Sequence, residues 1–279
     1  MPLRFLAKNT MQKNTFLYPP PATWRVRWNM YTDTPLPQEE PAGDNPPDGA
    51  IIDYYLYEKA KDVRIYIQPQ TTRAEGLNKG IRSYTSNDTL YKIGDQNIPL
   101  YWIRPQQIVS TEPGHHRFVW DLKYDPLNVP PSYPIAAVYK NTAPDATAPW
   151  VMPGIYKVTL YVDGKMYDNY ITVKMDPRVK TSAKDLQLQH DLSLQCYERR
   201  KDCMDILKEM RAIQSTQPEV KQLIDSVSRL NNSYAGTFSS LQDSDWPPTS
   251  QMVNAVSELN KQFARFQKEW SVLKEKIKH

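Results

Sequence analysis

The hydrophobic pattern of the chain changes period near Arg178, and this change limits the folds that the sequence can adopt. Before it, short runs rich in β-branched and aromatic residues alternate with turn residues, as in antiparallel strands. After it, apolar residues recur every three or four positions, as in packed helices. With 279 residues, the chain is long enough for two modest domains. The sequence therefore predicts an α+β protein, in which a β domain precedes a helical domain.

The β region, residues 48–178, is expected to form an antiparallel sandwich of the immunoglobulin or fibronectin-III-like kind. Asp163-Gly164 favours the positive φ angles of a type I′ turn and so predicts a hairpin. Alternation of apolar and polar residues along 156–162 predicts one buried face. No strand is assigned to the polar insert 71–111. The six strand-like runs cover residues 50–58, 62–68, 116–124, 133–140, 154–164 and 165–175.

The helical region, residues 179–279, is expected to form a three-helix antiparallel bundle. Its third helix, from Thr249, carries apolar residues at spacings that alternate between four and three, as in helices packed nearly parallel or antiparallel. The first helix carries an apolar stripe that begins at Leu188 and includes Cys196 and Cys203. These two cysteines would lie about 10 Å apart along a helix axis, too far for a disulfide, and are interpreted as core residues.

Residues 1–47 are expected to form a proline-rich arm or linker rather than a domain. The chain contains 24 Pro against 9 Gly, and the clusters "YPPPA" and "DNPPDG" favour stiff, extended backbone. The stretch from Gly43 to Gly49 is interpreted as a rigid joint, in which Gly49 frees the chain to enter the first strand. Residues 1 to about 45 are expected to be poorly packed, or packed on a second copy.

Several classes of function lack support in the sequence. The net charge of +4 comes from 35 basic residues spread among 31 acidic ones, which is not typical of nucleic-acid binding. No metal, cofactor or nucleophile motif occurs, and His115 and His116 would point to opposite faces of a strand. No membrane span and no signal-peptide core are predicted, because every apolar run is too short. No cofactor, metal or nucleic-acid partner is therefore expected.

Carboxylates and aromatic rings are the remaining candidates for a site. Glycoside hydrolysis needs only two facing carboxylates, and Asp44, Asp48, Asp53, Glu58, Asp121 and Asp125 qualify by residue type alone. Aromatic rings can stack on sugars, although most aromatic residues of a sandwich are core. The residues considered for carbohydrate or interface contacts are Trp24, Trp28, Trp102, Trp150 and Tyr54.

Several stretches together resemble one family. "TFLYPPPATWRVRW", "GDNPPDGAIIDYYL", "PGHHRFVWDLKYDP", "PGIYKVTLYVDGKMYDNYITVKMDPR" and "SLQDSDWPPTSQMVNAVSELNKQF" occur in this order. They resemble the C-terminal region of sortilin-type, Asp-box (BNR) repeat β-propeller proteins, which are large, secreted, bacterial and described as glycosyl-hydrolase-like. The resemblance covers nearly all of the chain after about Asn14.

The resemblance implies a role without catalysis. The chain contains no Asp-box repeat, so any catalytic cleft of the family would lie in the propeller that is missing here. The expected function is therefore a non-catalytic accessory or interaction region, with a propeller domain or another protein as partner and no enzymatic activity of its own. The alternative is a carbohydrate-binding module that uses exposed aromatic residues of the sandwich. The resemblance also implies a secreted or periplasmic location, and either a C-terminal fragment or a truncated gene product.

Overall fold

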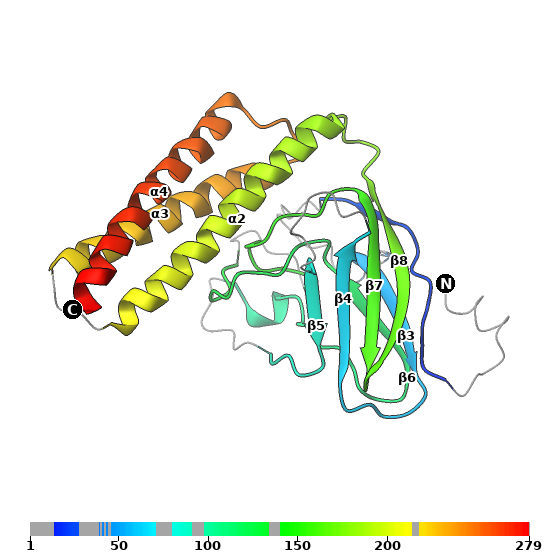
Figure 1. Ribbon diagram of the computed structural model, residues 1–279. Helices are drawn as coiled ribbons and strands as arrows, with labels where there is room; N and C mark the ends of the chain where they lie inside the picture. The colour runs from blue at the N-terminus through cyan, green and yellow to red at the C-terminus, as the bar shows by residue number, and fades with distance from the viewer. Residues whose placement is uncertain are drawn as a thin grey trace. The chain divides into compact units, whose positions relative to one another are not determined.

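The structure is a computed structural model that describes residues 14–27, 39, 41, 43, 46–70, 80–90, 98–133, 140–213 and 218–278. The chain divides into two compact units. The first, Met1–Asp145 with Pro153–Arg178, is a β region of two sheets, one of them a curled half-barrel. The second, Ala146–Met152 with Val179–His279, holds three packed helices (Figure 1). The predicted α+β class, with β-structure before helices, is confirmed.

The smaller sheet of the β unit has three strands in the order β1-β3-β6. Both pairings are antiparallel, and the register places Asp53 opposite Arg117 and Tyr55 opposite His115. Because side chains alternate between faces, Asp53, Tyr55, His115 and Arg117 lie on one face of this sheet. The strands are β1 (Phe16–Leu17), β3 (Ala50–Leu56) and β6 (Gly114–Trp120).

The larger sheet has five strands in the order β2-β8-β7-β4-β5. β2 runs parallel to β8, and the other neighbours are antiparallel. As predicted, the apolar residues along 156–162 face inward, and the residues between them are partly exposed. The strands are β2 (Thr23–Arg25), β8 (Lys165–Met175), β7 (Gly154–Val162), β4 (Val63–Pro69) and β5 (Arg82–Thr85).

The core of the β unit lies where the two sheets face each other. Trp120 of β6 packs edge-on against Tyr156 of β7 with 5.4 Å between ring centroids. The ring of Phe118 on β6 is tilted against that of Tyr84 on β5, with 4.5 Å between ring centroids. Trp120 is fully buried, and its indole N–H donates to the carbonyl of Lys123, so its polar atom is satisfied inside the core.

The predicted strand runs agree with β3, β4, β6, β7 and β8. The sixth run, 133–140, falls mostly on residues 134–139, which lie outside the described part of the chain. β1, β2 and β5 were not predicted as strands, because each has four residues or fewer and depends on partners far away in the sequence. β5 lies in the polar insert where no strand was assigned.

Residues 14–27 contradict the expectation of a poorly packed arm. β1 belongs to the smaller sheet and β2 to the larger one, so this segment joins both. Leu17, Tyr18 and Arg25 are buried, and the Tyr18 N–H donates to the carbonyl of Asp53 at 3.0 Å. The side chain of Asn169 on β8 donates to the carbonyl of Leu17 at 3.2 Å. Packing is favoured because apolar side chains are buried while the backbone finds hydrogen-bond partners.

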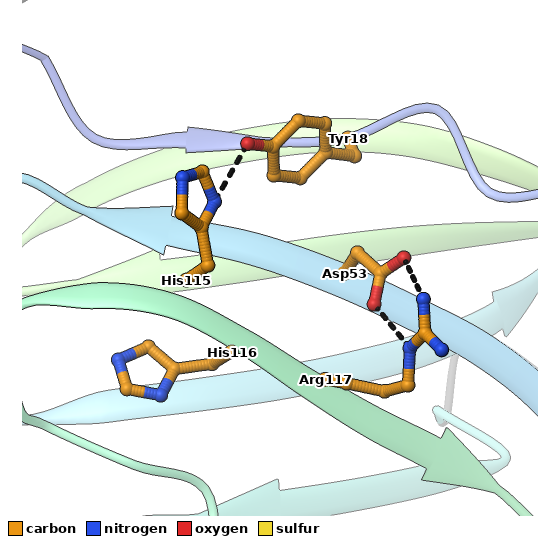
Figure 2. Close-up of a pocket in the computed structure, with 5 residues that line it drawn as sticks. All are labelled: Tyr18, Asp53, His115, His116 and Arg117. Carbon is orange, nitrogen blue, oxygen red and sulfur yellow. Dashed lines mark hydrogen bonds and ion pairs between the residues drawn. The ribbon is translucent and has the colours of Figure 1, made fainter. Parts of the chain in front are cut away.

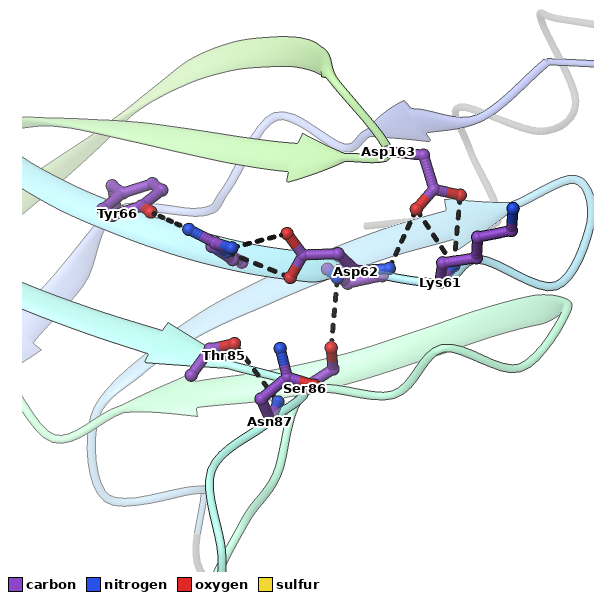
Figure 3. Close-up of polar contacts among 9 residues, drawn as sticks. Lys61, Asp62, Tyr66, Thr85, Ser86, Asn87 and Asp163 are labelled. Atoms are coloured by element: carbon purple, nitrogen blue, oxygen red, sulfur yellow. Dashed lines mark hydrogen bonds and ion pairs between the residues drawn. The ribbon is translucent and has the colours of Figure 1, made fainter.

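The hairpin between β7 and β8 has the predicted turn. Asp163 has φ 47° and Gly164 has φ 91°, and positive φ at both central residues is characteristic of type I′. The Asp163 carboxylate also accepts hydrogen bonds from the backbone N–H groups of Lys61 and Asp62, at 3.0 and 2.8 Å (Figure 3). The turn therefore secures the start of β4 as well as joining two strands.

The helical unit is a three-helix bundle built from α2 (Ala183–Ala212), α3 (Pro218–Gln242) and α4 (Ser250–Lys278). Ser182 caps α2 by accepting from the Asp185 N–H, and Thr249 caps α4 by accepting from the Met252 N–H. Pro218 occupies the first position of α3, where its missing N–H costs little. None of the described helices is long and apolar enough to cross a membrane.

The bundle core agrees with the predicted stripes except at the start of α2. Leu188 is 40% exposed, whereas Leu186 is buried, so Leu188 was wrongly assigned to the stripe. Leu186 and Leu188 both lie at helical spacings from the apolar residues that follow them. The buried face also contains polar Gln189 and Ser193, so the apolar pattern alone does not identify it. Cys196 and Cys203 are free, fully buried core residues, as predicted.

The helical unit also contains residues 146–152, which lie between β6 and β7 in the sequence. Ala148 and Val151 of this segment are buried, and the Trp150 N–H donates to the side-chain carbonyl of Gln242 at 3.1 Å. Gln242 in turn donates to the hydroxyl of Ser193 at 2.8 Å. The segment is thus tied to both α2 and α3.

Replacing Gly49 with alanine should destabilise the protein at the point where the chain enters β3. Gly49 has φ 141°, and a Cβ at this position would lie 2.1 Å from the carbonyl oxygen of Trp120. We expect Gly49→Ala to lower the free energy of unfolding by about 3 kcal/mol or more in urea titrations followed by circular dichroism. Gly43→Ala is the matched control, since a Cβ there meets nothing within 4 Å, and should change stability by less than about 0.5 kcal/mol. Equal effects would contradict the structure.

The two thiols should be unreactive in the folded protein. Burial raises the pKa of Cys196 and of Cys203 to about 12, and neither side chain is exposed. We expect no reaction with DTNB at pH 8 until urea is added, after which both of the 2 cysteines should react. Rapid modification without urea would mean that this part of the bundle opens readily.

Candidate binding surfaces

A depression of about 270 Å³ lies on the three-stranded sheet, lined by Tyr18, Asp53, His115, His116 and Arg117 (Figure 2). β3 and β6 supply four of these residues, and Tyr18 follows directly after β1. The register of the sheet explains the grouping, because it sets Asp53 beside Arg117 and brings Tyr18 alongside Asp53.

An ion pair occupies one side of this depression. The guanidinium of Arg117 donates to both carboxylate oxygens of Asp53, at 2.8 Å from Nε and 3.0 Å from Nη2. The Asp53 side chain is only 8% exposed, whereas that of Arg117 is 53% exposed. These hydrogen bonds and the charge of Asp53 raise the pKa of Arg117. The bidentate geometry holds both groups in a fixed arrangement and commits the Asp53 carboxylate to its partner.

The two histidines do not act together. The Tyr18 hydroxyl lies 2.8 Å from Nδ1 of His115, and burial, together with the charge of Asp53, raises the pKa of Tyr18, so this hydroxyl stays protonated at neutral pH. His116 lies on the other face of the strand, where its ring is 5.0 Å from that of Tyr54. No group of three or more His, Cys, Asp or Glu within the described ranges could hold a metal.

The outward surface of the five-stranded sheet carries exposed apolar side chains from three strands. Trp24 is 50% exposed, Ile155 47%, Met166 70% and Tyr170 51%. We call these four residues the outer aromatic face. Their neighbours follow from the register, which pairs Trp24 with Lys174, Ile155 with Thr172 and Lys157 with Tyr170. All of these residues belong to paired strands, so the sheet sets their positions on this surface.

Charged groups on the same surface are mostly paired. Lys157 binds Asp168 at 2.9 Å, and the Thr159 hydroxyl donates to the same carboxylate at 2.6 Å. Arg64 binds Asp62 at 2.8 Å and also contacts the Tyr66 hydroxyl (Figure 3). Lys174 is different, because its ammonium lies over the Trp24 ring, 5.4 Å from the centroid.

A second exposed tryptophan lies in the helical unit, between α3 and α4. Trp246 is 73% exposed, and Pro247-Pro248 follows it. The backbone of this loop is held in place: the side chain of buried Gln189 donates to the carbonyls of Ser244 and Trp246, at 2.6 and 3.3 Å. The Thr181 hydroxyl donates to the carbonyl of Asp245 at 2.5 Å. The loop therefore presents its tryptophan from a fixed backbone.

The residues proposed from the sequence for carbohydrate or interface contacts lie in different places. Trp24 is exposed on the outer aromatic face. Trp102 is half-buried at the end of a short 3₁₀ helix, Leu100–Trp102, and Trp150 is half-buried in the helical unit. Tyr54 is 1% exposed, with its hydroxyl donating to the carbonyl of Ser110, so it presents no ring to a ligand. Trp28 lies outside the described residues.

Several candidate carboxylates are engaged in structural contacts. Asp48 pairs with Arg104 at 3.1 Å, as Asp53 does with Arg117. Asp125 accepts from the Ser83 N–H at 3.2 Å, and Asp121 accepts from the Lys123 N–H at 3.3 Å. Asp44 lies outside the described residues.

Sequence reasoning missed the residues that make the exposed surfaces distinctive. Tyr170 could have been found, since the turn at Asp163-Gly164 sets β8 opposite β7, and the outward residues of β7 were predicted. Lys174 could not, because its position beside Trp24 depends on a parallel pairing across some 150 residues. Trp246 was read only as part of a break between helices, and nothing local indicates that its backbone is fixed by α2.

Comparison with known proteins gives no match. No protein-family model, no curated protein and no solved structure matches this chain. The resemblance to Asp-box propeller proteins therefore stays a prediction, and the function has to be argued from the surfaces described above.

The Asp53–Arg117 pair should stabilise the three-stranded sheet. Arg117→Met leaves a nearly buried carboxylate without its partner, and we expect a loss of about 1–2 kcal/mol, moderated because Arg117 is itself half exposed. The double variant with Asp53→Asn should lose less than the sum of the single variants, as measured by urea unfolding. Lys59→Met is the control, since Lys59 and Glu112 pair with side chains 68% and 61% exposed. If the losses of unfolding free energy in the two single variants add up to that of the double variant, Asp53 and Arg117 do not stabilise each other.

Proposed function

We propose that this chain is a non-catalytic accessory region of a secreted, glycosyl-hydrolase-like propeller protein, and that it binds a protein partner. The observation that carries the proposal is Trp246, a 73% exposed tryptophan on a loop whose backbone is fixed by hydrogen bonds from Gln189 and Thr181. Tryptophan is enriched among the residues that dominate binding energy at protein interfaces. A fixed loop loses little further entropy on binding, which favours affinity.

The contacts of the reactive side chains support a role without catalysis. The thiols of Cys196 and Cys203 are buried, with the pKa of each raised to about 12. Asp53 is held by Arg117, and Tyr18 by His115. Each of these groups is used to stabilise a sheet or the bundle.

The β unit is proposed to be an immunoglobulin or fibronectin-III-like sandwich, and the helices an antiparallel bundle. The strand order supports the first assignment. If the segment with β1 and β2 is strand A and β3 to β8 are B, C, C′, E, F and G, the sheets are A-B-E, which contains β1, and A-G-F-C-C′, which contains β2. This grouping is typical of such sandwiches, which commonly act as binding modules. The short connections between the helices support the assignment of an antiparallel bundle.

The partner can be tested with an Asp-box β-propeller domain of the family that the sequence resembles. We expect a complex in sedimentation velocity and calorimetry, and we expect Trp246→Ala to weaken it by about 30-fold or more, as loss of a central tryptophan does. Trp24→Ala is the matched control, because it removes an exposed tryptophan from the other unit and should leave this affinity unchanged.

Two results would contradict this function. One is the absence of a complex at propeller concentrations of about 100 μM. A dissociation constant above that value would be weaker than specific interfaces generally show. The other is release of reducing sugars from polysaccharides by the purified chain alone, since that would make the chain an enzyme.

Carbohydrate binding is the second candidate function. The observation that favours it is that Trp24 and Tyr170, each about half exposed, lie on the same surface of the five-stranded sheet. Aromatic rings present a flat apolar surface on which the apolar side of a sugar can stack.

A further inference from the structure

We infer that the outer aromatic face binds an acidic polysaccharide, with a sugar stacked on Trp24 and a sugar carboxylate paired with Lys174. The inference rests on the second proposed function, carbohydrate binding, and names its site and its substrate class. It is independent of the proposed protein partner, which is assigned to Trp246 in the other unit.

The geometry of the sheet suits an extended chain of sugars. Trp24 stands directly opposite Lys174 on β8, and Tyr170 lies four residues earlier on the same strand. Four residues of a strand span about 13 Å, so one oligosaccharide can contact both rings. Because β2 is paired to β8 along its length, the two rings keep this spacing without a ligand.

The charges select an acidic polymer. Lys157 and Arg64 already have carboxylate partners, Asp168 and Asp62. In the described part of the chain, the contact of Lys174 is with the Trp24 ring, and no carboxylate pairs with it. This surface therefore has an uncompensated positive charge beside its most exposed indole, which a uronic acid complements and a neutral sugar does not.

The polar side chains between the rings favour a polysaccharide over an apolar protein surface. Thr172, Lys157 and Asp168 lie beside or between the exposed apolar residues of β7 and β8. A dry apolar partner would bury the Lys157–Asp168 pair and remove its solvation. A hydroxylated polymer can exchange hydrogen bonds with these groups and leave them partly hydrated.

The test compares two forms of one polymer. Polygalacturonate carries free carboxylates, and its methyl-esterified form has the same backbone without them. By isothermal calorimetry at low salt, we expect wild-type protein to bind polygalacturonate about tenfold more tightly than the esterified form, with a preference that falls as salt rises. Lys174→Gln should remove this preference and leave binding of the esterified polymer unchanged. Trp24→Ala should weaken binding of both forms about tenfold or more.

Controls separate binding from folding. Lys221→Gln, which removes an exposed lysine of α3, and Trp246→Ala should leave both affinities unchanged. If Trp24→Ala lowers the urea midpoint, Trp24→Tyr keeps an aromatic ring in the strand and should retain the preference for the acidic form.

The outcomes distinguish the two levels of the proposal. Equal affinity for both polymers, or an unchanged preference in Lys174→Gln, overturns the acidic assignment while carbohydrate binding through Trp24 stands. No binding of either polymer overturns both. Neither result affects the proposed partner of Trp246, which is measured with the propeller domain.

Discussion

The parallel pairing of β2 with β8 is the interaction on which the exposed surface of the β unit depends. It places Trp24 opposite Lys174, so that an indole and an ammonium from distant parts of the sequence meet. The same segment enters the other sheet at β1, and Asn169 of β8 donates to the carbonyl of Leu17. Three prolines, residues 19–21, lie between the two strands, where a missing N–H disturbs no ladder. One short stretch thus joins both sheets and positions a candidate binding residue.

Two tryptophans are presented to solvent by different physical means. Trp24 is positioned by the pairing of β2 with β8, which brings the ammonium of Lys174 over its ring. Trp246 is fixed by side chains that satisfy the carbonyls of its loop, chiefly the buried Gln189. Tryptophan is enriched among the residues that dominate binding energy at protein interfaces. We propose a separate ligand for each surface, a polysaccharide for Trp24 and a protein for Trp246.

Local patterns predicted the features that depend on neighbours in sequence. The change of period near Arg178, the turn at Asp163 and the buried cysteines all follow from spacing or from residue type over a few positions. Features that depend on distant partners were missed or misjudged. β1 and β2 are too short to produce a pattern, and residues 146–152 belong to the helical unit because Trp150 finds Gln242 almost a hundred residues later. The exposed surfaces combine such long-range pairings, so only the ring types could be proposed from the sequence.

Residues 14–27 contribute β1 to one sheet and β2, with Trp24, to the other. Hydrogen–deuterium exchange with mass spectrometry tests this placement directly on peptides from this segment. We predict slow exchange, with protection approaching that of β3 and β8, because the Tyr18 N–H is bonded to the carbonyl of Asp53 and β2 is paired with β8. Exchange as fast as in an unfolded peptide would contradict it, and the proposed polysaccharide surface would then lack its fixed tryptophan.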